Sequence, residues 1–172
     1  NIVLPNILKA KQTETTQRFK IHLLTGAGED LFTKIEFSRG GNDEAPVIEP
    51  VDVSILREYK MAPLLISHYD AYATVWQKIT ALSKRTTVQG RDIFDIFILS
   101  TKEIPVIDKA MKKIDIVNTA IDRIFEVSFE QFRDTVVCYL SPEDQRTYAD
   151  SSIWDEIRLK AEEVIKKVAG IR

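Results

Sequence analysis

The chain has 172 residues, of which 44% are hydrophobic and 29% charged, so it can bury a core as one domain or as two small lobes. Its formal net charge of -2 excludes a general attraction of the whole surface to nucleic acid, so contact with RNA would need a local basic patch. A single cysteine, Cys138, excludes an internal disulfide, and no Cys/His cluster has the spacing of zinc ligands.

The sequence carries no sign of a membrane or export segment. No apolar run reaches the roughly 18 residues of a membrane span, and the N-terminal residues do not resemble a signal peptide. We therefore expect a cytoplasmic protein with no membrane contact. The chain begins at Asn1 rather than at a methionine, which leads us to expect processing or a fragment of a longer protein.

Two strands are predicted near the N-terminus. Residues 18–25 and 31–38 alternate between apolar and polar side chains, as half-buried strands do. Gly26 and Gly28 lie between them and tolerate positive φ, so the two strands should form an antiparallel hairpin. One face of this hairpin would be buried in a core, and the other is rich in ionisable groups.

The remainder of the chain turns from short strands to helices. Residues 47–53 and 55–59 could give short strands, another should end near His68, and Asp70 is placed to cap the first helix. Helices are expected at residues 71–84, 91–100, 106–114, 115–127, 128–140 and 152–169, with a shorter one after Ser141-Pro142-Glu143. The pattern predicts an α+β fold in which a small antiparallel β lobe, residues 1–62, precedes an all-helical bundle lobe, residues 63–172.

Glu36 is the first candidate for chemistry because it lies in mid-strand with Lys34 and Ser38 on its face. A carboxylate placed in this way can hold magnesium in a phosphoryl-transfer site, which needs several converging oxygen anions. The alternative is the solvated face of an edge strand, whose charges prevent the addition of a further strand. Taken alone, the spacing favours the edge strand.

Lys78 lies on an otherwise apolar helical stretch. Its ammonium either extends to solvent past the apolar side chains or points into a cleft towards an anion such as a triphosphate. Without further context the first alternative is favoured. Arg85, shortly after this helix, could contact RNA phosphates as part of a local basic patch, although solvent exposure is the simpler explanation.

The next predicted helix begins with three charged residues that its fold does not require. Arg91 and Asp95 are four residues apart and can pair along one side of a helix, while Asp92 lies near the positively charged helix N-terminus. These structural roles account for each residue taken singly.

Three features in this order resemble the AbiEii/AbiGii-type nucleotidyltransferase toxin family. They are the strand Lys34-Ile-Glu36-Phe-Ser38, the helical segment Gln77-Lys78-Ile-Thr-Ala81-Leu, and the helix start Arg91-Asp92-Ile-Phe-Asp95. The resemblance is strong from about Leu31 to Leu99 and weaker elsewhere. It implies that the β lobe is a remnant of a nucleotidyltransferase core in which carboxylates hold magnesium and a nucleotide passes from an NTP to RNA such as tRNA.

The resemblance also implies roles for single residues. Glu36 would be the acidic strand residue and metal ligand, Lys78 would contact the triphosphate, and either Asp92 or Asp95 would be the family's later aspartate. Arg91 would orient that aspartate or contact a phosphate. Lys34 and Arg85 would bind substrate, and a cognate antitoxin could be a partner.

One part of the family pattern is missing from this chain. The opening Gly-Ser motif and the Asp-x-Asp pair, which supply the first metal ligands, have no match in the sequence. We therefore expect either the C-terminal portion of a longer enzyme, inactive as this fragment, or a degenerate relative. Magnesium would bind only with upstream carboxylates. The alternative function is a non-catalytic helical interaction module that binds a partner such as an antitoxin.

Overall fold

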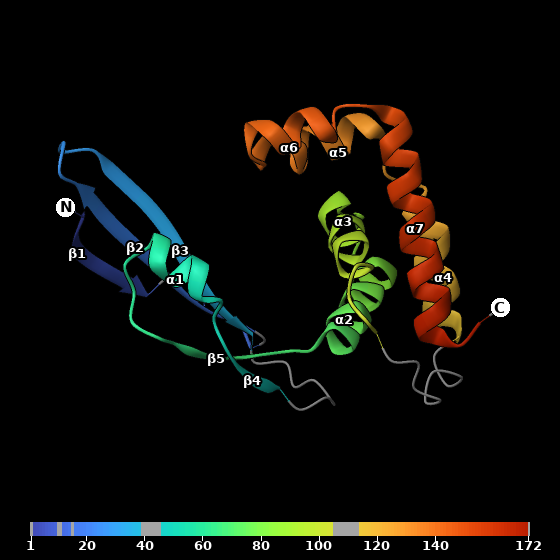
Figure 1. Cartoon of the computed structure of the whole chain (residues 1–172), viewed down its shortest axis with the longest axis horizontal. Helices are drawn as coiled ribbons and strands as arrows, with labels where there is room; N and C mark the ends of the chain where they lie inside the picture. The colour runs from blue at the N-terminus through green and yellow to red at the C-terminus, as the bar shows by residue number, and fades with distance from the viewer. Residues whose placement is uncertain (1, 10–11, 15, 39–45, 105–113, 172) are drawn as a thin grey trace. The chain divides into compact units, whose positions relative to one another are not determined.

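The fold is α+β, as predicted, and it divides into two compact units, Asn1–Ala45 and Pro46–Arg172 (Figure 1). A computed structural model of the protein describes residues 2–9, 12–14, 16–38, 46–104 and 114–171. Among the helices in these ranges, none is both long and apolar enough to cross a membrane.

Unit 1 is a three-stranded antiparallel sheet with the strand order β1-β2-β3. The strands are β1 (Ile2–Lys9), β2 (Thr16–Thr25) and β3 (Asp30–Ser38). The predicted hairpin of β2 and β3 is confirmed, and its turn needs Gly28, which has a φ of 83° and donates its backbone N–H to Thr25 O at 3.0 Å. Strand β1 was not predicted. Its pairing with β2 shifts register between Val3 and Asn6, around Pro5, because proline lacks a backbone donor.

The expected core face of the hairpin is not buried. The register pairs Phe19 with Ile35 and Leu23 with Leu31, so these apolar side chains share one face of the sheet. Nevertheless, Leu31 is 45% exposed, and none of the described side chains of unit 1 is buried. The alternation correctly predicted two distinct faces, but a sheet face becomes a core only when a second layer covers it.

Unit 2 opens with a short strand pair on either side of a helix. Strands β4 (Val47–Pro50) and β5 (Leu65–His68) pair antiparallel, and α1 (Val53–Glu58) lies between them in sequence. The strand expected at 55–59 is therefore wrong. The Asp52 carboxylate caps α1 by accepting from the Ser54 backbone N–H at 2.7 Å, which favours a helix at this point.

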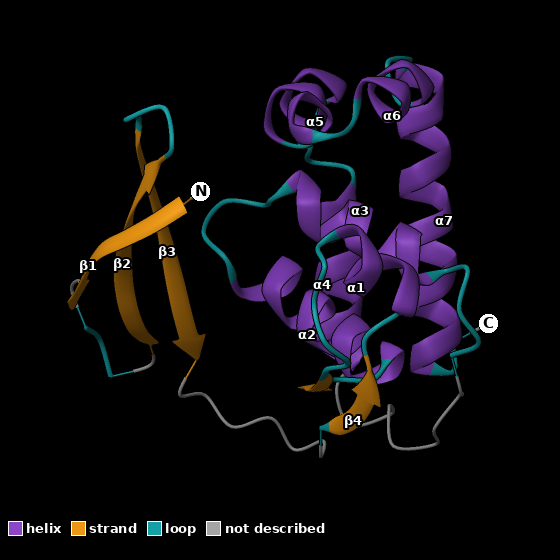
Figure 2. Cartoon of the chain, turned by 60° about the vertical axis from the view of Figure 1, so that its left-hand side comes forward, coloured by secondary structure: helices purple, strands orange, loops and turns teal. Residues whose placement is uncertain are grey.

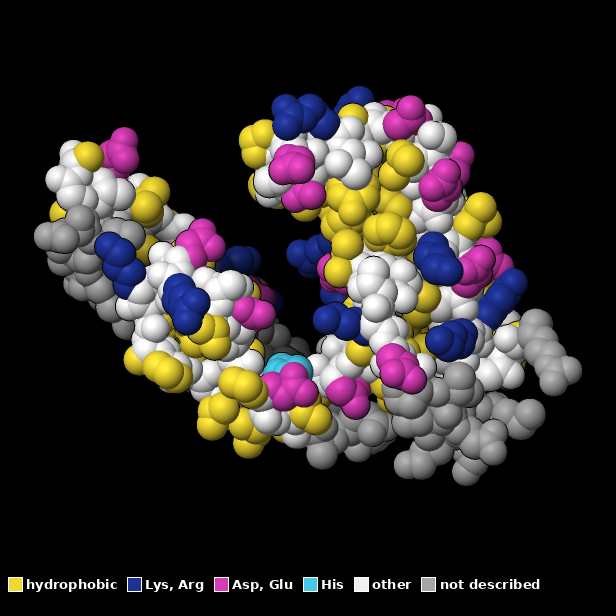
Figure 3. All heavy atoms as spheres, in the orientation of Figure 1, with side chains coloured by type: hydrophobic (Ala, Val, Ile, Leu, Met, Phe, Trp, Pro, Cys, Tyr) yellow, Lys and Arg dark blue, Asp and Glu magenta, His cyan; other side chains and the backbone are white. Residues whose placement is uncertain are grey.

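The segment 46–68 exposes many hydrophobic side chains, several of which are visible on the surface in Figure 3. The exposed ones are Ile48, Val53, Ile55, Tyr59, Met61, Leu64, Leu65 and Ile66. This segment belongs to unit 2, so the expected boundary between residues 62 and 63 falls inside that unit. The domain boundary between residues 62 and 63 therefore stays a prediction.

The helices of unit 2 follow the predicted order closely (Figure 2). They are α2 (Ala71–Lys84), α3 (Gly90–Leu99), α4 (Ile114–Ile124), α5 (Phe129–Thr135), α6 (Pro142–Thr147) and α7 (Ser151–Ala169). The helix expected at 106–114 lies almost wholly outside the described residues. The helix expected at 128–140 ends early, because Val136 leaves helical geometry (φ -129°, ψ -61°) and a 3-10 helix, Val137–Tyr139, follows.

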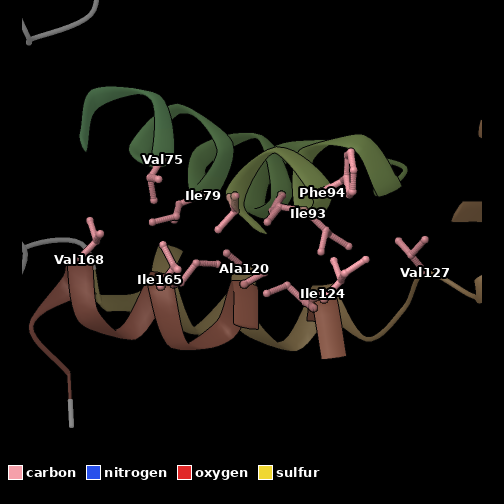
Figure 4. Close-up of a cluster of buried hydrophobic side chains, with 14 of the residues drawn as sticks. Val75, Ile79, Ile93, Phe94, Ala120, Ile124, Val127, Ile165 and Val168 are labelled. Carbon is pink, nitrogen blue, oxygen red and sulfur yellow. The ribbon is translucent and has the colours of Figure 1, made fainter. Parts of the chain in front are cut away.

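Helices α2, α3, α4 and α7 enclose the hydrophobic core, to which each contributes side chains (Figure 4). Trp154 of α7 anchors one end of this core. Its ring stacks on Phe132 with 4.1 Å between centroids, and its buried Nε1–H donates to Val127 O at 3.0 Å. This hydrogen bond joins α7 to the segment before α5, so the indole meets both the packing and the polar requirements of the site.

Replacing Trp154 with Phe should destabilise unit 2 by about 1–3 kcal/mol, because the Val127 carbonyl then lacks its buried donor. Urea unfolding followed by circular dichroism measures this change. Leu159→Ala is the control: Leu159 lies on the same helix but is exposed, so the expected change is within about 0.5 kcal/mol. Equal effects of the two substitutions would contradict the assigned role of Trp154.

Candidate functional site

A buried carboxylate lies in the first turn of α3. Asp92 is 1% exposed and is the only charged side chain among the buried residues that the structure describes. The turn is tight, since the Asp92 backbone N–H donates to Gln89 O at 3.0 Å and Gly90 is buried between them. A carboxylate removed from water in this way destabilises a fold unless cations or hydrogen-bond donors compensate for it.

Two cations provide this compensation. Lys78 Nζ of α2 lies 3.1 Å from Asp92 Oδ1, and Arg85 Nη1, just after α2, bonds Asp92 Oδ2. Lys78 Nζ also lies 2.5 Å from Asp95 Oδ2, one turn further along α3. We call these four residues the Asp92 cluster. It brings together four of the residues that the sequence singled out, from two helices and the segment between them.

The geometry corrects two sequence interpretations. Asp95 pairs with Lys78 rather than with Arg91, because the packing of α2 on α3 brings the ammonium across to it. Arg91 is exposed and has no ion pair in the part of the chain that the structure describes. The Lys78 ammonium neither extends freely to solvent nor faces an open cleft in this state, since two carboxylates bind it.

Arg123 of α4 is a residue that sequence reasoning missed. Its Nη1 donates to the carbonyl oxygens of Leu82 (2.8 Å), Ser83 (3.2 Å) and Arg85 (2.7 Å), and its Nη2 donates to Thr86 O at 3.3 Å. These bonds satisfy carbonyls at the C-terminal end of α2 and fix the backbone that carries Arg85. No sequence signal could reveal contacts that join residues about 40 positions apart.

The Asp92 cluster can present two positive groups to an anion. Lys78 and Arg85 keep N–H donors beyond those that contact Asp92, and both side chains remain partly exposed. Ammonium and guanidinium groups are the usual protein ligands for phosphate oxygens. Because Asp92 and Arg123 already orient the site, an arriving phosphate would need little rearrangement of the backbone.

Glu36 and Lys34 belong to unit 1 and form a separate group. Glu36 Oε1 lies 2.9 Å from Arg18 Nε and 3.3 Å from Lys34 Nζ. Hydrogen bonds from Lys34 and then from Arg18 hold the pKa of the Glu36 carboxyl below its ordinary value of 4.5. The structure therefore brings Glu36 together with cations.

The described carboxylates do not by themselves fit a magnesium site. In the described ranges no three or more His, Cys, Asp or Glu side chains gather so that they could hold a metal ion. Glu36 and Asp92 each contact two cations, whereas magnesium prefers several oxygen ligands.

The family model for the nucleotidyl transferase AbiEii toxin of type IV toxin–antitoxin systems matches residues 3–150. The match covers nearly all of unit 1, the Asp92 cluster and helices α1 to α6, so most of the chain and all of the candidate residues lie within it. The chain belongs to this AbiEii nucleotidyltransferase toxin family.

Two crystal structures from Helicobacter pylori are also similar, one of a candidate nucleotidyltransferase and one of the protein JHP933. Their sequence identities are 15% and 16%, with TM-scores of 0.49 and 0.48. Each alignment covers 98% of this chain but 67% and 65% of the other, so the chain spans about two thirds of their length. These similarities are too distant to support an argument about activity. No curated protein matches the chain significantly.

Asp92→Asn should lower the free energy of unfolding of unit 2 by about 1–3 kcal/mol, because two cations lose their charge partner at a buried position. Asp95→Asn is the matched control. Asp95 is 44% exposed and shares only Lys78, so the expected loss is under about 1 kcal/mol. Urea unfolding of both variants compares them, and a larger loss for Asp95→Asn would contradict the assignment.

The lowered pKa of Glu36 gives a pH-dependent contribution to the stability of unit 1. Since the folded pKa lies below the unfolded value, this contribution is fully present above about pH 4.5 and is lost as the pH falls through the folded pKa. Lys34→Gln should raise the Glu36 pKa towards 4.5, as measured by NMR titration of the carboxyl carbon. A pKa unchanged by Lys34→Gln would show that the Lys34 hydrogen bond is not its cause.

Proposed function

We propose that this chain is part of a nucleotidyltransferase that transfers a nucleotide from an NTP to RNA, and that the Asp92 cluster contacts the triphosphate. Family membership supports the reaction class. The observation that carries the residue assignment is that one buried carboxylate orients two partly exposed cations from separate segments. Both cations remain partly exposed and keep donors that could bind an anion in addition to Asp92.

Each residue of the site has a distinct part in this proposal. Lys78 and Arg85 bind triphosphate oxygens, and Asp92 is a positioning residue that holds both of them. Asp95 keeps the Lys78 ammonium in place before the nucleotide binds. When the nucleotide arrives, Lys78 exchanges its contact with Asp95 for a contact with a phosphate oxygen. Arg91, exposed on the same turn of α3, adds a further phosphate contact. In unit 1, Lys34 binds substrate and Glu36 is the acidic residue of the transferase core.

Magnesium would bind only if additional carboxylates completed the site with Glu36. When bound, the ion would neutralise triphosphate charge and help to align the attacking hydroxyl. Glu36 is the ligand that we propose from this chain, and carboxylates outside the described residues would have to complete the site. The NTP and RNA substrates are consistent with a cytoplasmic location, which we also propose.

The second candidate is an interaction module without chemistry, with a partner such as the antitoxin that the family's classification suggests. The exposed hydrophobic side chains of segment 46–68 favour this alternative, because large apolar surfaces of this kind often mark protein contacts. The two candidates differ in what they require of Lys78 and Arg85, since only the transferase needs them to bind phosphate.

Titration of the full chain with each of the four NTPs, with and without magnesium, tests the proposal by calorimetry. Lys78→Gln and Arg85→Gln should each weaken binding about 10-fold or more, the usual effect of removing a hydrogen bond to a charged group. Lys84→Gln is the control, because Lys84 is exposed at the end of α2 and lies outside the cluster. NTP binding that Lys78→Gln and Arg85→Gln leave unchanged, or no binding of any NTP, would contradict triphosphate recognition by the Asp92 cluster. Either result would favour the second candidate, the interaction module.

A further inference from the structure

The ionisable face of the β2–β3 hairpin carries an exposed aromatic ring beside basic side chains. Phe32 of β3 is 73% exposed, and its ring stacks on that of His22 with 4.7 Å between centroids and 14° between planes. The neighbouring cross-strand pair on this face is Lys20 and Lys34. We call these four residues the stacking face.

The stacking face is poorly explained by the stability of the sheet. Lys20 and Lys34 are directly opposite each other, and like charges in that position are unfavourable. A phenylalanine that remains mostly in water contributes little burial. The stacked pair of His22 and Phe32 can stabilise the hairpin, but it accounts neither for the opposed lysines nor for the face of the Phe32 ring that remains open to solvent.

The nearby carboxylates leave this face positively charged. Asp30 Oδ1 lies 2.5 Å from His22 Nε2, and Glu36 pairs with Arg18 and Lys34. Lys20 is exposed and has no ion pair with any described residue. The centre of the face thus combines an open aromatic ring, the exposed Lys20 ammonium and the Lys34 ammonium, which shares Glu36 with Arg18.

We propose that the stacking face binds single-stranded RNA, with one base stacked on Phe32 and backbone phosphates contacting Lys20 and Lys34. Aromatic side chains on sheet surfaces bind unpaired bases in this manner, and lysines beside them follow the phosphates. An acidic peptide would use the two lysines but would have no need of the exposed ring. A duplex keeps its bases stacked internally and cannot offer one to Phe32.

This inference deepens the proposed function and rests on it for the identity of the ligand as an RNA acceptor. Its test needs no nucleotide transfer. Fluorescence anisotropy of the full chain with a labelled oligouridine of about 12 nucleotides measures the dissociation constant directly. Failure of NTP binding at Lys78 and Arg85 and failure of RNA binding at Phe32 are therefore separate results.

Three variants make the expected result quantitative. Phe32→Ala should weaken RNA binding at least about 5-fold, the lower end of the loss for one base–aromatic stack, while Phe32→Trp should retain it. Lys20→Gln should reduce the slope of log Kd against log salt by about 0.7, the value for one phosphate contact on a single strand.

Matched controls separate binding from folding. Phe37→Ala removes an exposed ring from the opposite face of the same strand, and Lys167→Gln removes an exposed lysine of α7, so neither should change the Kd. Thermal unfolding of each variant reports whether the sheet survives. The proposal is overturned if the unmodified chain binds no RNA, or if it binds duplex RNA equally well. It is also overturned if Phe32→Ala lowers Tm while the Kd stays unchanged.

Discussion

The buried carboxylate of Asp92 is the constraint on which the arrangement of the helical unit depends. Removed from water, it must be met by positive charge, and this requirement fixes Lys78 of α2 and Arg85 beyond α2 against the start of α3. Arg123 then holds the backbone around Arg85 from α4. Three helices and a connecting segment are thus tied to one charge, in addition to the apolar contacts of their core.

Unit 1 is organised by a different rule, because cross-strand register rather than burial determines which of its side chains lie together. The register that aligns Phe19 with Ile35 also aligns Lys20 with Lys34 and His22 with Phe32. A change of one residue would exchange the two faces. The described side chains on both faces are exposed or half-buried, and none is buried.

Family membership and local geometry contribute different information about function. The family establishes that the chain is of the nucleotidyltransferase toxin kind. The geometry distinguishes the contacts of the two aspartates: Asp92 is buried and contacts both Lys78 and Arg85, whereas Asp95 has only the more exposed contact with Lys78. The sequence spacing did not distinguish these two aspartates. In the structure they differ, because Asp92 is buried and Asp95 is partly exposed.

The sequence by itself determined the local elements and the family. Alternation and periodicity predicted the β2–β3 hairpin, α2, α3 and α7, because the pattern of apolar residues and caps is local information. Only tertiary structure decided that Lys78 pairs with Asp95, that Arg123 supports Arg85, and that no described side chain of the hairpin is buried. These facts depend on which distant segments meet, and neither spacing nor composition encodes such contacts.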